Sequence, residues 1–443
     1  MNEKIAYLDL PKYCKAHGSI TLPGSKSISN RVLLLAALSP GVTKINGLLN
    51  SDDTSVMIDS LNKLGIQINN TSDNVVEIIS EGNLNNRNLN LFLGNAGTAF
   101  RPLLAALSFM DGTYNLSGIQ RMHERPIGDL VDALRQLGCN INYLGDIGYP
   151  PVSIGAFQTN NINLVSIKGS VSSQFLTSLL MAAPVFTRKI NQSLTIEVEG
   201  NLISKPYIDI TLNLMKKFGV SVKKLSDNKF FIDSKDFYKS PKEIFIEGDA
   251  SSASYFLGLG AIAGGPLTVN GVGLDSIQGD VNFTKILQLM GAKINIFSNK
   301  IESSGICVQN GEKLKAFDID FNTIPDAAMT AAVLALYADN KCYLRNIASW
   351  RVKETDRILA MKTELSKFGV QVESGDDWLS IDPIEYNLWP RQVSIDTWND
   401  HRMAMCFSLS SFGKTDVRIM DPSCINKTFP DYFDVFNKIA YIK

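Results

Sequence analysis

The stretch LPGSKSISNRVLLLAAL, residues 22–38, joins a polar turn to a short helix of small apolar residues. Pro-Gly marks the turn, and the serines that follow are residue types that commonly cap a helix start. Free backbone N–H groups and the helix dipole attract negative charge at such a start. The loop therefore predicts an anion site, although it is not a Walker A motif, because Ser25 separates Gly24 from Lys26.

The same combination of polar turn and small-residue helix recurs along the chain. It occurs again as LGNAGTAFRPLLAAL (93–107), KGSVSSQFLTSLLMAA (168–183), EGDASSASYFLGLGAIA (247–263), TIPDAAMTAAVLAL (323–336) and TWNDHRMAMCFSL (397–409). Such recurrence indicates a repeated supersecondary unit, and the small residues indicate tight core packing. If the six helix starts face one another, they form a polar cleft suited to anions.

A second recurring segment ends a helix on glycine and continues as an alternating strand. It reads SLNKLGIQI, ALRQLGCNI, LMKKFGVSV, ILQLMGAKI and ELSKFGVQV, with glycines at Gly65, Gly138, Gly219, Gly291 and Gly369. Glycine just past the last helical turn adopts the left-handed conformation that ends a helix. The unit therefore reads β-α-β-α-β-β over about 75 residues. Six units in 443 residues predict two α/β halves of three units each.

The composition excludes several classes of protein. A formal net charge of -1 offers no global basic field for nucleic acid or an acidic membrane. The six cysteines form no C-x-x-C pair and the three histidines are dispersed, so neither a zinc site nor a disulfide framework is expected. No signal peptide or membrane span is recognised. A monomeric cytoplasmic protein without metal or other cofactor is predicted, with small molecules as its only partners.

Basic residues gather beside the predicted helix starts. Besides Lys26, the residues in or next to these loops are Arg31, Arg101, Arg121, Arg125, Arg351, Lys353, Arg357, Arg402 and Lys427. Any one of them alone is compatible with a solvated surface charge. In a chain of near-zero net charge, their clustering indicates a concentrated anion site, and guanidinium groups suit bidentate binding of phosphate and carboxylate.

Two acids stand among these basic residues. Asp326 follows Pro325 and could merely be an N-cap, and Glu354 could be an ordinary i, i+3 partner of Arg357. A carboxylate surrounded by Lys and Arg has a lowered pKa, which suits a base better than an acid. No G-x-S-x-G or H-E-x-x-H motif offers another catalyst. The residues therefore predict acid–base chemistry on phosphorylated, carboxylated substrates.

Nine strings in register resemble the EPSP synthase family of enolpyruvyl transferases, between about residues 17 and 436. They are LPGSKSISNR, GNAGTAFRPL, RMHERPIGDLVDAL, SVSSQFLTSLLMAAP, ISKPYIDIT, PDAAMTAA, RVKETDRI, NDHRMAM and KTFPDYF. The resemblance implies an α/β fold of two inside-out barrels, each of three βαβαββ repeats with helices inside and sheets outside. It places one domain at residues 21–244 and a discontinuous domain at residues 1–20 plus 245–443.

The resemblance also implies a reaction. Shikimate 3-phosphate and phosphoenolpyruvate give 5-enolpyruvylshikimate 3-phosphate and phosphate, a step of the shikimate pathway toward chorismate and the aromatic amino acids. The 5-hydroxyl adds to the central carbon of phosphoenolpyruvate while the methylene carbon is protonated. The tetrahedral intermediate then loses phosphate as that methyl group is deprotonated. Both substrates are anions, which agrees with the many basic residues.

Matching by motif position implies roles for individual residues. Shikimate 3-phosphate would be held by Lys26, Ser27, Arg31, Ser172, Ser173, Gln174, Ser204, Tyr207, Asp326, Ser349 and Lys353. Phosphoenolpyruvate would be held by Lys26, Gly97, Arg125, Gln174, Arg357, Arg402 and Lys427. Asp326 would take the hydroxyl proton, and Glu354 would deliver and remove the proton at the methylene carbon. Lys26 is a second candidate for carrying a proton.

One position departs from the family pattern, and one loop keeps it. Ser349 stands where the family typically has an Asn that contacts the shikimate moiety, so a shorter hydrogen-bonding group is expected there. The NAGTA loop keeps Gly97 and Thr98, and Pro102 follows Arg101. That pattern is similar to forms sensitive to glyphosate, which mimics phosphoenolpyruvate. Inhibition by glyphosate is therefore expected.

Three alternatives stand beside this reading. UDP-N-acetylglucosamine enolpyruvyl transferase would share the fold, but it typically carries a catalytic Cys, and Cys139 reads as a core residue after LRQLG. A nucleic-acid 3′-phosphate cyclase would need a nucleotidyl-accepting His, whereas His401 lies within NDHR. A non-catalytic phosphate-binding protein would have no use for Asp326 and Glu354 together.

Overall fold

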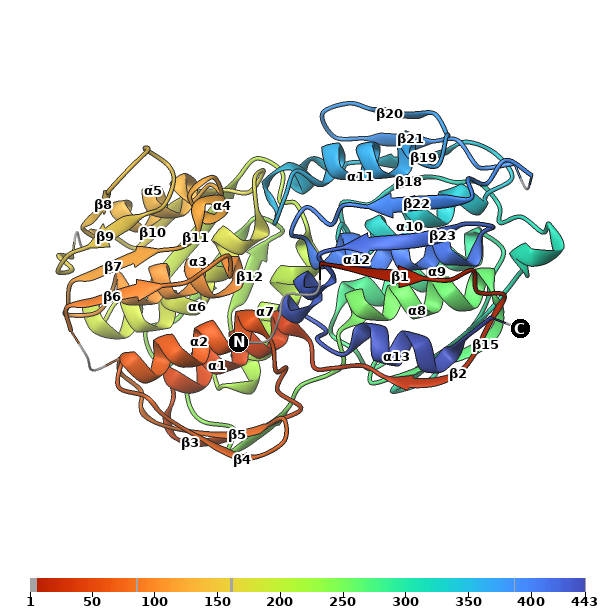
Figure 1. Cartoon of the computed structure of the whole chain (residues 1–443). Helices are drawn as coiled ribbons and strands as arrows, with labels where there is room; N and C mark the ends of the chain where they lie inside the picture. The colour runs from red at the N-terminus through yellow and green to blue at the C-terminus, as the bar shows by residue number, and fades with distance from the viewer. Residues whose placement is uncertain (1–5, 85–86, 160–161, 386, 443) are drawn as a thin grey trace. The chain divides into compact units, whose positions relative to one another are not determined.

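The computed structural model describes residues 6–84, 87–159, 162–385 and 387–442 and divides into two compact units (Figure 1). The central unit spans Gly24–Ile246, and the terminal unit combines Met1–Pro23 with Glu247–Lys443. Both ends of the chain therefore belong to the same unit, and the chain passes between the units at two points in the sequence.

The strands of the central unit form three four-stranded sheets among the described residues. Their bounds are β3 (Pro40–Asn46), β4 (Gln67–Ser72), β5 (Val75–Glu81), β6 (Leu89–Phe92), β7 (Tyr114–Ser117), β8 (Ile141–Tyr143), β9 (Val152–Ile154), β10 (Leu164–Lys168), β11 (Leu194–Glu199), β12 (Lys223–Ser226), β13 (Lys229–Ile232) and β14 (Glu243–Phe245). The strand orders are β14-β3-β5-β4, β6-β7-β9-β8 and β10-β11-β13-β12. In each sheet the first pair is parallel and the other two pairs are antiparallel.

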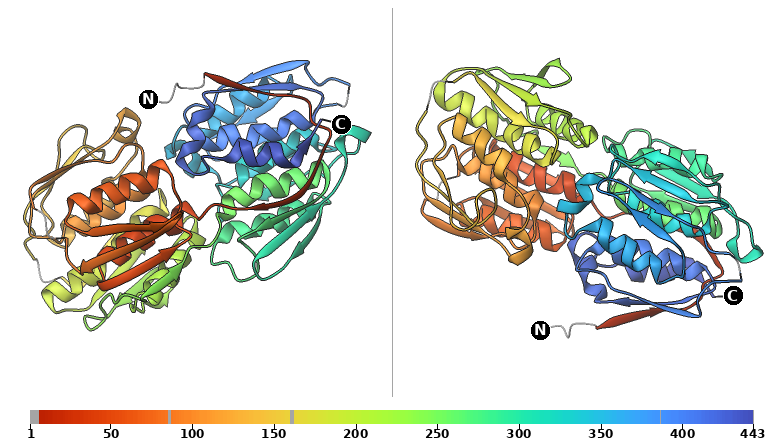
Figure 2. Two further views of the ribbon diagram at one scale, coloured as in Figure 1. Left: turned by 60° about the horizontal axis from the view of Figure 1, so that its bottom comes forward. Right: turned by 90° about the horizontal axis from the view of Figure 1, so that it is seen from above.

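The helices of the central unit form the middle of its core. They are α1 (Lys26–Ala37), α2 (Asp52–Lys63), α3 (Gly97–Leu107), α4 (Gln120–His123), α5 (Gly128–Gln136), α6 (Ser173–Ile190) and α7 (Lys205–Lys217). Nearly every residue of α1 and α3 is buried, although α1 also carries the polar side chains of Lys26, Asn30 and Arg31. Helix α3 packs against both α1 and α6, while β3 and β5 lie against α1 (Figure 2).

The strands of the terminal unit repeat this sheet pattern with two modifications. Their bounds are β1 (Tyr7–Leu10), β2 (Lys15–Thr21), β15 (Gly264–Asn270), β16 (Lys293–Ile296), β17 (Lys300–Ser304), β18 (Asp318–Asp320), β19 (Cys342–Arg345), β20 (Val372–Ser374), β21 (Leu379–Ile381), β22 (Gln392–Ile395), β23 (Asp416–Met420) and β24 (Ala440–Tyr441). The order β18-β19-β21-β20 is that of the central sheets. In the sheet β16-β17-β15-β2-β24, strand β24 is added to the four strands of the shared pattern. The sheet β1-β23-β22 has three strands, and the N-terminal strand β1 is one of them.

The helices of the terminal unit carry most of its predicted site residues. The α-helices are α8 (Ala250–Ile262), α9 (Phe283–Leu289), α10 (Ala328–Leu334), α11 (Arg357–Ser366), α12 (His401–Ser408) and α13 (Tyr432–Ile439). The 3-10 helices are η1 (Gly279–Asn282), η2 (Val308–Asn310), η3 (Ala335–Tyr337), η4 (Ala348–Val352), η5 (Leu409–Phe412) and η6 (Pro422–Lys427). Every residue of α8 is buried, and α10 packs against both α8 and α12.

The recurring segments of the sequence appear where they were predicted. The six small-residue helices are α1, α3, α6, α8, α10 and α12. The five glycines that follow a helix all have φ between +80° and +98°. Glycine adopts this left-handed conformation without the steric cost of a Cβ, so it ends each helix and starts the turn to the next strand. The α/β fold class is confirmed.

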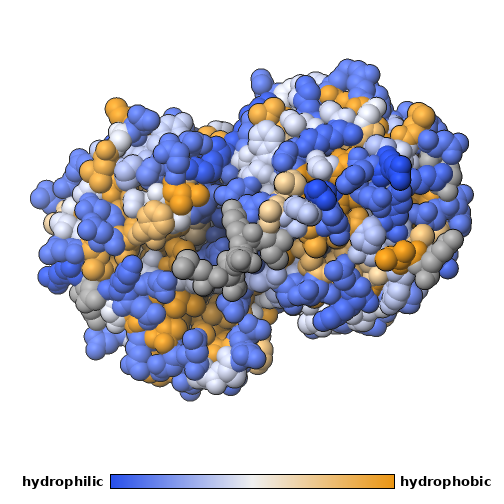
Figure 3. Space-filling model, viewed as in Figure 1, coloured by the Kyte–Doolittle hydropathy of each residue, from blue (hydrophilic) through white to orange (hydrophobic). Residues whose placement is uncertain are grey.

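The exposed large hydrophobic side chains of the described residues are spread over many elements. Figure 3 shows hydrophobic residues scattered among hydrophilic ones on the face in view. The most exposed large hydrophobic side chains, such as Ile147, Leu388 and Phe245, belong to separate segments. Within the described residues, no helix combines the length and the apolar character needed to cross a membrane.

Candidate active site

The residues singled out from the sequence fall into two groups, one in each unit. The central group consists of Lys26, Ser27, Arg31, Gly97, Arg125, Ser172, Ser173, Gln174, Ser204 and Tyr207. The terminal group consists of Asp326, Ser349, Lys353, Glu354, Arg357, Arg402 and Lys427. In each group, most members lie at or next to the start of a helix.

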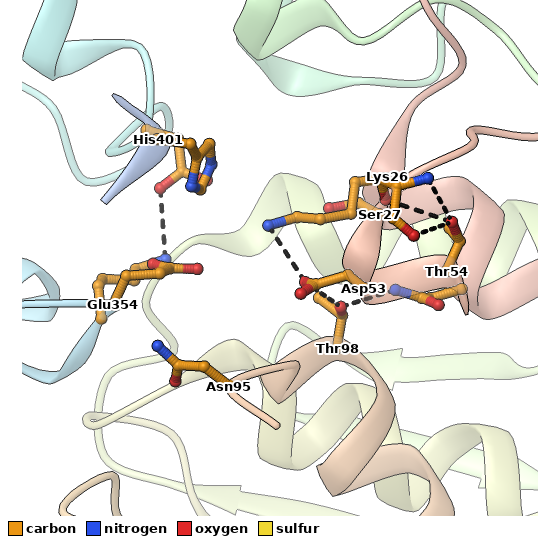
Figure 4. Close-up of polar contacts among 12 residues, drawn as sticks. Lys26, Ser27, Asp53, Thr54, Asn95, Thr98, Glu354 and His401 are labelled. Carbon is orange, nitrogen blue, oxygen red and sulfur yellow. Dashed lines mark hydrogen bonds and ion pairs between the residues drawn. The ribbon is translucent and has the colours of Figure 1, made fainter. Parts of the chain in front are cut away.

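Lys26 is the first residue of α1 and is held beside a buried carboxylate. Its Nζ lies 3.6 Å from Asp53 Oδ2, and the two side chains are 9% and 4% exposed. Thr98 Oγ1 donates to the same oxygen at 3.3 Å, and Asn30 Nδ2 donates to Thr98 at 2.8 Å (Figure 4). Helices α1, α2 and α3 therefore meet around one ion pair. The N-cap Ser25 makes no side-chain cap bond, contrary to the capping predicted for this loop.

Arg31 lies one turn further along α1 and is buried among uncharged oxygen atoms. Its Nε donates to Thr211 Oγ1 at 2.9 Å, and its NH1 donates to the Ser27 carbonyl at 2.8 Å. Its NH2 lies 3.4 Å from both Thr177 Oγ1 and the Tyr207 carbonyl. Burial lowers the pKa of this guanidinium to about 10, so it stays charged near neutral pH. A buried cation bound to neutral oxygens is suited to attract an anion.

Gly97 begins α3 and lets two guanidinium groups approach the helix start. A Cβ at this position would lie 2.6 Å from Arg101 NH1 and 2.7 Å from Arg125 NH2. Arg125 NH1 donates to the carbonyl and to the side-chain oxygen of Asn95, both at 3.0 Å. Arg101 NH1 donates to Gln174 Oε1 at 2.6 Å. A side chain at position 97 would therefore displace one or both guanidinium groups.

The remaining members of the central group lie at the starts of α6 and α7. Ser172 caps α6, and its Oγ accepts from the Gln174 backbone N–H at 3.3 Å. Ser204 precedes α7 with a φ of 52°, a left-handed value that is uncommon for serine. Arg31 bonds to residues of both helices, so it ties these two starts to α1.

Arg357 is the centre of the terminal group. Its guanidinium donates to three carboxylates: NH1 to Asp326 Oδ1 at 2.9 Å, NH2 to Glu354 Oε2 at 2.9 Å and Nε to Asp400 Oδ2 at 2.8 Å. The side chain is only 1% exposed. Burial alone would lower the pKa of Arg357, but Asp400, Glu354 and Asp326 outweigh it and raise the pKa. The cation is therefore permanent, and it fixes the positions of three acids.

Asp326 accepts from cations on both of its oxygens. Arg402 NH2 donates to Oδ2 at 2.9 Å, while Lys353 Nζ lies 3.5 Å from Oδ1, the oxygen that Arg357 also contacts. Burial alone would raise the pKa of this carboxyl, but Arg402, Lys353 and Arg357 hold it well below its usual range. The reading of Asp326 as an N-cap is wrong, because Ala327 occupies that position of α10 without a side-chain bond. An ionised acid among cations is instead suited to accept a proton.

The segment between η4 and α11 places Lys353 and Glu354 beside Asp326. Asp356 caps α11 by accepting from the backbone N–H groups of its first turn at 3.1 and 3.2 Å. Trp350 Nε1 donates to the Pro325 carbonyl at 2.7 Å and so fixes this segment to the residue before Asp326. Glu354 is also the i, i+3 partner of Arg357 that the spacing suggested. Ser349 lies half-buried on η4.

Arg402 and Lys427 complete the terminal group. Asp400 caps α12 by accepting from the Arg402 backbone N–H at 2.9 Å. Arg402 NH1 donates to the hydroxyl of Tyr255, on α8, at 3.0 Å. Lys427 ends η6, which packs against α12. Three cations of this group therefore come from separate helices, and Lys353 comes from the segment after η4.

Four residues of these groups were not singled out from the sequence. They are Asp53, Tyr255, Asp280 and Asp400, each buried and each bonded or close to a predicted site residue. Asp400 had a usable signal, since it precedes a small-residue helix at the N-cap. For metal binding, no group of three or more His, Cys, Asp or Glu side chains with suitable placement occurs in the described part of the chain.

We expect Asp280→Asn to stabilise the protein in a pH-dependent way. Burial, and then Asp326, raise the pKa of Asp280 from 3.8 to about 6, while the Ser251 hydroxyl donates to it at 2.6 Å. Its contribution to stability is therefore complete below pH 3.8 and is lost as the pH rises through 6. Asn keeps an acceptor for Ser251 but does not ionise, so the gain should be about 3 kcal/mol at pH 8 and about half of that at pH 5. Urea unfolding at both pH values measures it, and a pH-independent difference would contradict it.

Comparison with known proteins gives consistent results over the whole chain. Residues 12–436 match the family described as EPSP synthase (3-phosphoshikimate 1-carboxyvinyltransferase). The chain is 61% identical over 432 residues to a 3-phosphoshikimate 1-carboxyvinyltransferase of Bordetella pertussis, covering 98% of both chains. Identity to the protein of the same name from Paraburkholderia phytofirmans is 55% over 434 residues, covering 98% of this chain and 99% of that one.

Solved structures show the same fold at lower identity. A structure of EPSP synthase from Acinetobacter baumannii superimposes with a TM-score of 0.78 at 24% identity and covers 98% of both chains. The enolpyruvyl transferase NikO from Streptomyces tendae gives a TM-score of 0.77 at 15% identity and covers 99% of this chain and 98% of that one. Both solved structures match the whole chain rather than only one of its units.

Proposed function

The chain belongs to the EPSP synthase (3-phosphoshikimate 1-carboxyvinyltransferase) family, and we propose that its two groups of buried charges carry out the transfer from phosphoenolpyruvate. The product would be 5-enolpyruvylshikimate 3-phosphate, with phosphate released. The single observation that carries this role is the Asp326 carboxylate, which is 14% exposed and is held in its ionised form by Arg357, Arg402 and Lys353. Such a site supplies a base together with cations for an anionic substrate.

The fold expectation from the sequence becomes part of this proposal. We propose that the two units are the two domains and that each is an inside-out barrel of three βαβαββ repeats. The recurring strand order supports it, because four sheets share one sequence of parallel and antiparallel pairs and the other two are variants of it. The buried helices α3 and α8 support the placement of helices inside each barrel.

The substrate assignments follow from the chemistry of each group. Hydroxyls and one buried guanidinium suit a phosphorylated polyol, so the residues proposed to hold shikimate 3-phosphate are Lys26, Ser27, Arg31, Ser172, Ser173, Gln174, Ser204, Tyr207, Asp326, Ser349 and Lys353. Cations around a helix-start glycine suit a small phosphorylated carboxylate, so those proposed to hold phosphoenolpyruvate are Lys26, Gly97, Arg125, Gln174, Arg357, Arg402 and Lys427.

The proposed proton transfers use the two acids bonded to Arg357. Asp326 takes the proton of the 5-hydroxyl as that oxygen bonds to the central carbon of phosphoenolpyruvate, while Glu354, in its protonated form, protonates the methylene carbon. The bond to the phosphate oxygen then breaks, and phosphate leaves with the electron pair and with the proton that Asp326 took up. Glu354 takes back a proton from the methyl group, so both acids return to their starting forms. Anionic substrates that share the surrounding cations raise the pKa of Asp326 and make it a stronger base. Lys26 is the second candidate for carrying a proton.

The direct test mixes the protein with phosphoenolpyruvate and shikimate 3-phosphate and follows phosphate release. We expect release only when both are present, and folded protein that releases none would contradict the proposal. Replacing shikimate 3-phosphate by UDP-N-acetylglucosamine tests the sister transferase, for which we expect no release. Release only with the sugar nucleotide would assign the chain to that activity instead.

We expect Gly97→Ala to weaken phosphoenolpyruvate binding and inhibition by glyphosate. The new Cβ would lie within 3 Å of Arg101 and Arg125, so the two guanidinium groups must move. A shift of this size should raise the KM for phosphoenolpyruvate about tenfold and leave the KM for shikimate 3-phosphate near its original value. Steady-state kinetics with and without glyphosate measure both effects.

Gly128→Ala is the matched control for this variant. Gly128 also begins a helix, α5, but a Cβ there would make only ordinary contact, at 3.4 Å, with the Gly148 backbone. We expect kinetics and inhibition like those of the original protein. Inhibition of Gly97→Ala as strong as that of the control would remove Gly97 from the proposed phosphoenolpyruvate site.

A further inference from the structure

The turn that leads into α12 has a backbone that its sequence does not favour. Trp398 and Asn399 both have a φ of 53°, and the Asp400 N–H donates to the Thr397 carbonyl at 2.8 Å. Two positive φ values closed by such a bond are features of a type I′ turn, which is dominated by Gly, Asn and Asp. Asn399 suits it, whereas a bulky Trp at positive φ is an outlier. Some other contact must therefore hold Trp398 in this conformation.

That contact is the carboxylate of Glu364 on α11. Trp398 Nε1 donates to Glu364 Oε1 at 2.9 Å, and the Asp396 backbone N–H donates to Oε2 at 3.0 Å. Lys367 Nζ lies 2.6 Å from Oε2, and the Glu364 side chain is 0% exposed. A buried carboxylate needs such donors, and here two of them come from the segment that enters the turn. Glu364 thus binds both sides of Thr397.

Helix α11 and this turn are joined at a second place, within the terminal group. Arg357 begins α11, and its Nε donates to Asp400, the last residue of the turn. Asp400 in turn accepts from the backbone of Arg402. The helix therefore binds the turn through Glu364 at one end and through Arg357 at the other. Arg402 is the second residue after this turn, so the backbone of the turn leads directly into it.

We propose that Glu364 and Trp398 are positioning residues that hold the turn so that Arg402 faces Asp326. Neither residue touches the terminal group directly, so they act through the backbone of the turn. Without the indole N–H bond, Trp398 can leave the left-handed region, and the turn can relax to another type. The Arg402 side chain then no longer points toward Asp326 or toward phosphoenolpyruvate, its proposed ligand. This inference rests on the proposed binding of phosphoenolpyruvate by Arg402.

The test compares Trp398→Phe and Glu364→Gln with the original protein. Phe keeps the ring but lacks the donor, so we expect the KM for phosphoenolpyruvate to rise about tenfold. Glu364→Gln keeps one acceptor oxygen, so a smaller rise, about threefold, is expected. The KM for shikimate 3-phosphate should stay within about twofold of its original value, since this turn does not contain its proposed ligands.

Trp389→Phe is the control for loss of a tryptophan in the same unit. Trp389 packs against Tyr337 and Phe368 with ring centroids 5.0 and 6.0 Å apart and is not part of the turn. We expect a lower melting temperature and unchanged KM values. If Trp398→Phe matches this control, or raises both KM values together in proportion to lost stability, the positioning role is refuted.

Arg402→Lys separates this inference from the proposed function. Lys lacks the fork that contacts Tyr255 and Asp326, so its KM for phosphoenolpyruvate should rise at least as much as that of Trp398→Phe. A raised KM in Arg402→Lys with an unchanged Trp398→Phe overturns the positioning role alone. An unchanged KM in Arg402→Lys removes Arg402 from the phosphoenolpyruvate site and overturns both assignments.

Discussion

Asp326→Asn is expected to lower kcat by about 10²- to 10⁴-fold, the range for removal of a general base. Asn has nearly the same shape, and its single side-chain oxygen can still accept from one of the two arginines. It does not take up a proton at neutral pH, so the 5-hydroxyl would lose its acceptor. The KM values should change far less than kcat, because Arg357 and Arg402 remain. Pre-steady-state phosphate release and steady-state kinetics measure the two effects.

The pH dependence of the reaction provides a second test of the role of Asp326. Because the pKa of Asp326 lies well below 3.8, this carboxylate stays ionised over the whole working range. An acid limb of kcat/KM, which reports groups of the free enzyme, would therefore belong to another group if it lies above about pH 5. Asp275→Asn changes an exposed acid in the same unit and should leave kcat unchanged. If Asp326→Asn retains more than about a tenth of the original kcat, Asp326 is not the base.

The fold was predictable because its signals are local and occur many times. Each of the five glycines after a helix needs only its own left-handed φ, and each small-residue helix shows its burial in its own composition. Both signals could be read without knowledge of distant contacts. Strands β1 and β24 pair with strands from far along the chain. Such pairing depends on distant contacts, and no repeat in the sequence marks it.

The site was predictable for its cations and less so for its acids. Arg357 and Arg402 stand out because several basic residues recur beside helix starts in a chain of near-zero net charge. Asp53 and Glu364 look like ordinary helix residues, and Asp400 looks like an ordinary N-cap, until the structure brings each beside a donor from another segment. Asp326 looked like an N-cap because sequence position alone does not reveal which way a side chain points.

Arg357→Met is expected to destabilise the protein by about 3–5 kcal/mol, the usual result of removing one partner of a buried ion pair. Met fills a similar volume, so the loss is mainly electrostatic. Asp326, Glu354 and Asp400 would each lose a donor at 2.8–2.9 Å. Urea unfolding near pH 7 measures the change, and binding of phosphoenolpyruvate should be lost as well.

Arg345→Met is the matched control, because it removes an arginine that pairs with a carboxylate at a solvent-exposed position. Arg345 also binds a carboxylate with two nitrogens, its NH2 lying 2.7 Å from Asp318 Oδ2, but the two side chains are 49% and 52% exposed. Exposed pairs contribute little, so the loss should be much smaller than that of Arg357→Met. Equal losses for the two variants would contradict the view that burial makes the Arg357 cluster strong.

The loss of stability caused by Arg357→Met should also depend on pH. The direction of this dependence follows from the depressed pKa of Asp326. A carboxyl whose folded-state pKa is depressed contributes stability above its unfolded pKa, here 3.8, and loses that contribution as the pH falls through the folded-state pKa. Without Arg357, the pKa of Asp326 rises, so less of that contribution remains at neutral pH. The difference between the two proteins should therefore be largest above about pH 5 and should shrink toward pH 4, where the variant's carboxyls become protonated. A difference that stays the same at all pH values would mean that the lost stability comes from packing around Arg357 rather than from its three carboxylates.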